Sequence, residues 1–171
     1  LKEDYRRYYG AFVGFSGRGE MIPNERSYCD IDPEVVDRWG IPVLRFHWEW
    51  GEAERAQARH MRRTFAGIIE AMGGKVIERN RSLRSRAVAP TEDGISIGGE
   101  IIHEVGTTRM GTSPRTSVLN EWCQAHDARN VFVADAGPFV TNAHKNATWT
   151  ILALAMRTAE HIADERKRGN L

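Results

Sequence analysis

At 171 residues the chain is long enough to bury one sizeable hydrophobic core, and its 41% hydrophobic and 27% charged residues are ordinary for a globular protein. The net charge of +1 argues against a nucleic-acid or membrane-surface partner, because such partners select a patch of one sign. No apolar run approaches the roughly 20 residues that a membrane span needs. The chain has two cysteines, Cys29 and Cys123, which are too few for a disulfide framework. They do not indicate whether the protein works in an oxidising or a reducing compartment.

The first 50 residues alternate turns with aromatic and β-branched runs. Leu44, Phe46, Trp48 and Trp50 are separated by single polar residues, a period of two that predicts an antiparallel strand with one face on a core. Asp32-Pro33 is typical of a turn between strands.

The glycine-rich run Gly14-Phe-Ser-Gly17-Arg-Gly19 invites comparison with a phosphate-binding loop. Its spacing differs from Gly-x-Gly-x-x-Gly and no helical pattern follows it, so we interpret it as a flexible hairpin connection.

The clearest helical pattern runs from Gly51 to Met72, with one apolar stripe and charged residues mostly off it. Gly73-Gly74 predicts its end. A short strand is expected over 75–78, followed by a long polar loop over 79–99. Loops of about 20 residues are usually functional or mobile, so this one is a candidate lid or rim of a substrate cavity.

The most informative stretch begins at His103, which Ile101-Ile102 leads into a turn at Gly106. Residues 131–133 predict a short buried strand that ends just before Asp135. Asn146 is a good N-cap, and the apolar spacing after it predicts a helix. The free N–H groups at the start of that helix suit an anionic or electron-rich ligand.

Three linked motifs in this stretch resemble the C-terminal part of the glucose-methanol-choline (GMC) family of flavin oxidoreductases. The first is His103-x-x-Gly-Thr-x-Arg-Met-Gly111, the second runs from Ser117-Val-Leu-Asn120 to Asn130-Val-Phe-Val-Ala-Asp135, and the third is Asn146-Ala-Thr-x-Thr-x-x-Ala-Leu-Ala-x-Arg157. Three motifs in one order are far more specific than one. Ala147 departs from the proline that sugar-oxidising relatives often carry there, a small change at the first turn of a helix.

The resemblance implies a role for each motif. His103 would accept the proton of an alcohol while a hydride leaves its carbon for N5 of FAD, and Asn146 would hold the substrate oxygen. Imidazole exchanges protons near neutral pH, and an amide N–H can donate to the same oxygen. The expected cofactor-binding residues lie at the end of the second motif and at the start of the third. Asp135 and Ala136 would lie against the ribityl and pyrophosphate portion, and Asn146, Ala147 and Thr148 at the C2 carbonyl of the flavin.

The resemblance also implies an α+β fold. Residues 1–104 would be the latter part of a substrate-binding domain, an antiparallel sheet with helices. Residues 105–171 would supply the last strand and helix of a Rossmann-like FAD-binding domain. The dinucleotide fingerprint of the family is absent, so we expect that the chain has lost its beginning and needs an N-terminal FAD-binding portion, from the same enzyme or a companion chain. The substrate would be a small alcohol, sugar, sugar acid or polyol.

Several alternatives remain. His144 is a rival for the second catalytic position, and Asn146-Ala-Thr148 also fits an N-glycosylation pattern. The histidines lack metal-site spacing, since Thr107 stands where His-Glu-x-x-His needs its second histidine. A non-catalytic α+β interaction module or subunit remnant is the alternative function. The sequence leaves open which hydroxyl is oxidised, the electron acceptor, the compartment and the oligomeric state.

Overall fold

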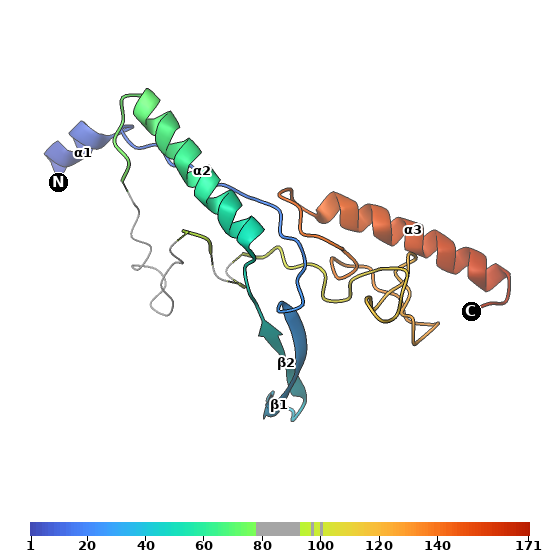
Figure 1. Ribbon diagram of the computed structural model, residues 1–171. Coiled ribbons are helices and arrows are strands. Elements are labelled where there is room, and N and C mark those ends of the chain that lie inside the picture. The colour runs from blue at the N-terminus through green and yellow to red at the C-terminus, as the bar shows by residue number, and fades with distance from the viewer. Residues whose placement is uncertain (78–92, 97, 100) are drawn as a thin grey trace.

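The computed structural model describes residues 1–77, 93–96, 98, 99 and 101–171. Over these residues the elements follow the order α1 (Lys2–Tyr8), β1 (Tyr28–Val36), β2 (Pro42–His47), α2 (Glu52–Ala71) and α3 (Thr148–Lys167). The other described residues form turns and irregular segments. The fold is therefore α+β, with one small antiparallel sheet and three helices in the described part of the chain (Figure 1).

The strands β1 and β2 form a hairpin in which Ile31 lies opposite Leu44. The predicted antiparallel strand is thus confirmed over Pro42–His47, although it ends before Trp48. The prediction that one face lies on a core is wrong, because Leu44 is 58% and Phe46 62% exposed. Figure 1 shows the reason: the hairpin projects away from the helices, so the described residues place no layer over it.

A cross-strand ion pair and an internal bend define the hairpin. Asp30 lies opposite Arg45 and accepts two hydrogen bonds from its guanidinium, at 3.0 and 2.7 Å. Asp32 and Pro33, predicted as a turn between strands, instead lie inside β1. The Asp32 carboxylate accepts the N–H groups of Glu34 and Val35, which explains the irregular register between Ile31 and Val36.

The helix α2 confirms the predicted helix to within a residue at each end. It ends where Gly73 takes a φ of +75°, a left-handed conformation that favours glycine. The strand predicted over 75–78 is not formed at 75–77, and Glu78 lies outside the described residues. Most of the predicted polar loop over 79–99, including the candidate lid, also lies outside them.

Three of the most buried described residues lie in α3 and in the loops that precede it. Leu119, Cys123 and Thr158 are each at most 2% exposed. Thr158 donates to the carbonyl oxygen of Trp122 at 3.3 Å, and the His161 ring stacks on the Trp122 indole with centroids 4.4 Å apart. These contacts fix α3 on the loops that precede it (Figure 1).

The strand predicted over 131–133 is not formed as a strand. Phe132 makes only an isolated bridge with Gln124, and Val131 is 47% exposed. The backbone of this run pairs with a loop instead: Ala125 N–H donates to the Val131 carbonyl and Val133 N–H to the Cys123 carbonyl, each at 2.9 Å. No neighbouring strand is present among the described residues to make a sheet there. The domain boundary at 104/105 stays a prediction.

Candidate active site

His103 is held in an irregular segment by its main chain and its ring. Its N–H donates to the Ile101 carbonyl at 2.9 Å, and its own carbonyl accepts from the Asn142 side-chain amide at 2.8 Å. The ring is half-buried, and its Nδ1 lies 3.3 Å from Nη1 of Arg18. Segments 39 and 85 residues away in sequence therefore meet at His103.

The turn after His103 packs on the turn that carries Asp135. Gly106 N–H donates to the Ala136 carbonyl at 3.2 Å, and Thr108 N–H to the Gly137 carbonyl at 3.3 Å. Gly106 has a φ of +83°, which favours glycine at this turn. The first and second sequence motifs are thus joined through their backbones.

This contact is close enough to require glycine at position 137. A Cβ at Gly137 would lie 2.2 Å from Thr108 Oγ1 and 2.9 Å from Asp135 Oδ1. The Asp135 carboxylate accepts the Gly137 N–H at 2.7 Å, which fixes the turn. Thr108 Oγ1 is buried and has no hydrogen-bond partner among the described residues.

The third motif leads into α3 without a side-chain cap. The predicted N-cap at Asn146 is wrong: Ala147 occupies that position, and its carbonyl accepts the first helical bond, from Ile151 at 2.9 Å. The Asn146 side chain is exposed, as is His144.

The start of α3 provides donors that fit the predicted cofactor. In any α-helix the first N–H groups lack carbonyl partners within the helix, and here no side chain caps them. Thr148, at the first helical position, is exposed, and Ala147 is half-buried. These donors and the helix dipole suit an electron-rich oxygen such as the C2 carbonyl of a flavin. The residues present therefore fit the expected group at this end of the site.

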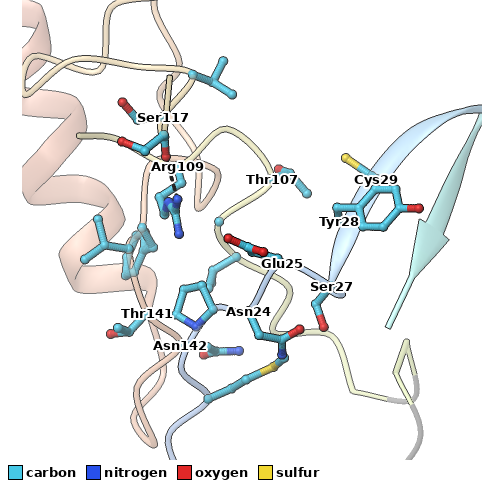
Figure 2. Close-up of a pocket in the computed structure, with 18 of the residues that line it drawn as sticks. Asn24, Glu25, Ser27, Tyr28, Cys29, Thr107, Arg109, Ser117, Thr141 and Asn142 are labelled. Carbon is cyan, nitrogen blue, oxygen red and sulfur yellow. Dashed lines mark hydrogen bonds between the residues drawn. The ribbon is translucent and has the colours of Figure 1, made fainter. Parts of the chain in front are cut away.

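A half-open cavity of about 660 Å³ adjoins the His103 loop (Figure 2). It lies among the base of the hairpin, the segment before it and the loops that carry the first motif. Neither His103 nor Asn146 lines it, but Asn142, whose amide holds His103, does. The polar lining residues labelled in Figure 2 are Asn24, Glu25, Ser27, Tyr28, Thr107, Arg109, Ser117, Thr141 and Asn142. Its volume is in the range of small-molecule pockets.

Two residues of this region had no predicted role. Arg109 belongs to the first motif, and its guanidinium donates to the Thr116 carbonyl at 2.5 Å beside the cavity. Asn142 lies between the second and third motifs, in a run with no regular pattern. Its position follows from backbone pairing with Met21, which leaves no local signal in the sequence.

The described part of the chain contains neither a cluster of metal-ligand side chains nor a helix that could span a membrane. No three His, Cys, Asp or Glu side chains there gather as metal ligands do. Among the same residues, no helix combines the length and the apolarity needed to cross a bilayer.

Comparison with known proteins identifies relatives along most of the chain. The protein is 34% identical over 159 residues to 2-methyl-1,2-propanediol dehydrogenase of Mycolicibacterium austroafricanum, covering 93% of this chain and 26% of that protein. It is 29% identical over 169 residues to the fructose dehydrogenase large subunit of Gluconobacter japonicus, covering 99% of this chain and 28% of that protein. It is 27% identical over 157 residues to the gluconate 2-dehydrogenase flavoprotein of Pantoea cypripedii, covering 92% of this chain and 25% of that protein.

The chain thus spans only about a quarter of the length of these relatives. The family model that describes the C-terminal region of GMC oxidoreductases matches residues 23–155, which is more than half of the chain. That match includes the first two motifs, Asn142 and the start of α3. This chain therefore belongs to the GMC oxidoreductase family, whose members are flavoprotein dehydrogenases and oxidases that act on sugars and polyols.

Proposed function

We propose that this chain is the C-terminal part of an FAD-dependent oxidoreductase that oxidises a CH–OH group of a sugar, sugar acid or polyol. The observation that carries the proposal is the contact between the two turns at Gly106 and Gly137, because it brings the His103 loop against the turn that carries Asp135. The named substrates of the relatives, a diol, a ketose and a sugar acid, support the substrate class.

The residues of this chain take distinct parts in the proposed reaction. His103 accepts the proton of the substrate hydroxyl, and the electron pair of the broken O–H bond stays on the oxygen. The Asn146 amide donates to the same oxygen and stabilises its growing negative charge. Asp135 and Ala136 would hold the ribityl and pyrophosphate portion of FAD, and Asn146, Ala147 and Thr148 would meet its C2 carbonyl. When bound, FAD supplies N5 as acceptor for the hydride that leaves the substrate carbon.

The proposal includes a requirement for an N-terminal FAD-binding portion, since the chain spans about a quarter of its relatives. The test is to join the chain to that portion of a close relative, or to add the portion in trans. A yellow protein that oxidises sugars or polyols supports the proposal. A stable, flavin-indifferent protein would instead support the non-catalytic interaction module.

Two substitutions in the joined enzyme test the assigned roles. His103→Ala should slow flavin reduction by substrate about 10²-fold or more, which stopped-flow absorbance measures. Near-normal reduction would remove the base role. Asn146→Ala should slow the same step and leave FAD bound, whereas loss of FAD would show that Asn146 is needed for cofactor retention instead. Glycosylation of Asn146 would exclude its catalytic role.

A further inference from the structure

Residues 17–19 end the glycine-rich run that we interpreted from the sequence as a flexible hairpin connection, and together with residues 20–22 they are fixed on α2. The Gln57 amide accepts the Glu20 N–H at 3.2 Å and donates to the Glu20 carbonyl at 3.0 Å, as a neighbouring strand would. The Ile22 N–H donates at 3.0 Å to the carboxylate of Glu54, which is only 6% exposed. Three hydrogen bonds therefore attach this segment to one face of the helix.

The two glycines of the segment allow this close approach. A Cβ at Gly17 would lie 2.3 Å from Met61 Sδ, and a Cβ at Gly19 would lie 2.6 Å from Gln57 Oε1. A larger residue at either position would have to displace the Met61 or Gln57 side chain, and displacing Gln57 would disturb its two hydrogen bonds to Glu20. Arg18 lies between the two glycines, so its backbone is positioned by the close contacts of Gly17 and Gly19 with α2.

The same segment reaches the His103 loop on its other side. Met21 and Asn142 exchange two backbone hydrogen bonds, at 2.8 and 3.0 Å, and the Asn142 amide holds the His103 carbonyl at 2.8 Å. The main chain of His103 is consequently tied to α2 through residues 17–22. The contact between Arg18 and the His103 ring, at 3.3 Å, spans the same two segments.

The chemistry of that contact determines which ring nitrogen carries hydrogen. A guanidinium has N–H donors and no acceptor, so the nitrogen that faces it must present a lone pair. Here that nitrogen is Nδ1, which leaves the hydrogen of the neutral ring on Nε2. We infer that Arg18 is a positioning residue for His103, which holds the imidazole with its lone pair at Nδ1 and its hydrogen at Nε2.

The catalytic consequence rests on the proposed function. With this tautomer, Nδ1 carries the only lone pair of the neutral ring, so Nδ1 is the atom that can take a proton and the substrate hydroxyl must approach that edge of the ring. Proton uptake would then move the hydroxyl hydrogen to Nδ1, with the O–H electron pair left on oxygen. The Arg18 N–H must give way at that moment, because a doubly protonated ring offers it no acceptor.

Nuclear magnetic resonance of the 171-residue chain with ¹⁵N-labelled histidine rings tests the inference. At a pH where the rings are neutral, the His103 signals, assigned by their loss in His103→Gln, should show hydrogen on Nε2 and none on Nδ1. Arg18→Met keeps the length of the side chain without its donors, so both tautomers should appear. Arg18→Lys keeps a donor and should restore the single form, which a merely structural role would not do.

Arg26→Met is the matched control, because Arg26 pairs with Glu49 at 3.0 Å and not with His103, so it should leave the His103 signals unchanged. The ring signals of His126, whose Nε2 lies 3.0 Å from Ser117 Oγ, report whether each variant is folded. Hydrogen on Nδ1 of His103 in the unaltered chain would overturn the inference whatever the variants do. An unchanged His103 spectrum in folded Arg18→Met would overturn it as well. Neither result depends on flavin reduction, so the His103→Ala experiment tests the proposed function separately.

Discussion

Replacing Gly137 with alanine should destabilise the protein, because the added methyl group has no room. Its Cβ would lie 2.2 Å from Thr108 Oγ1 and 2.9 Å from Asp135 Oδ1, well inside van der Waals contact. Gly137 is buried and its N–H and carbonyl are both hydrogen-bonded, so the turn can shift only by breaking those bonds. Overpacking of this kind costs about 1–3 kcal/mol. In a protein of this size that free energy corresponds to a fall in Tm of roughly 2–12 °C.

Thermal unfolding followed by circular dichroism measures this effect. The matched control is Gly67→Ala within α2, where a Cβ meets nothing within 4 Å, so the gain in helix propensity should raise stability by about 0.5–1 kcal/mol. Adding Thr108→Ala should recover much of the loss in Gly137→Ala, since it removes the clashing hydroxyl, which has no hydrogen-bond partner among the described residues. An unchanged Tm in Gly137→Ala, or no recovery in the double variant, would refute the packing of these two turns.

Two further predictions concern contacts away from the candidate active site. Arg55 and Arg59 donate to the Asp93 carboxylate at 3.1 Å each and hold its pKa below the ordinary 3.8. The folded-state pKa is thus lower than the unfolded one, so this stabilisation is complete above pH 3.8 and is lost as the pH falls below it through the folded-state pKa. Acid unfolding followed by fluorescence should therefore lose part of its pH dependence below 3.8 in Asp93→Asn, and an identical acid transition would contradict the pairing. Thr158→Val removes the hydroxyl that donates to the Trp122 carbonyl and should cost about 1 kcal/mol in urea unfolding, whereas an unchanged midpoint would show that this bond contributes nothing.

Elements with a strong local pattern were predictable from the sequence. The helix α2 has an apolar stripe over five turns and a glycine pair at its end, and each signal agrees with the others. The strand β2 follows from alternation alone. The predicted burial of its apolar face was wrong. Alternation shows that the two faces of a strand differ in polarity, but it does not show whether another element covers either face.

The strand expected over 131–133 shows the limit of a short apolar run. Such a run becomes a strand only when a neighbouring strand takes its backbone hydrogen bonds, and here residues 123–125 take them from a loop. The N-cap at Asn146 failed for a related reason. Asparagine is compatible with a cap, but the chain enters the helix one residue later, with Ala147 at the boundary.

The motifs predict candidate site residues, whose roles stay predictions, but they do not predict the residues that pairing across the chain brings to the candidate site. His103, Asp135 and Asn146 stand in motifs with fixed spacing, whereas Arg18, in the glycine-rich run, and Asn142 contact His103 from segments whose sequence does not predict that contact. Their contribution depends on Gln57 and on the backbone of Met21, which fix the approach of one segment to another. Motifs therefore predict candidate reacting groups, and by our inference the contact with Arg18 sets which nitrogen of the His103 ring presents its lone pair. A change at Arg18 should for that reason alter the His103 tautomer with the motif itself intact.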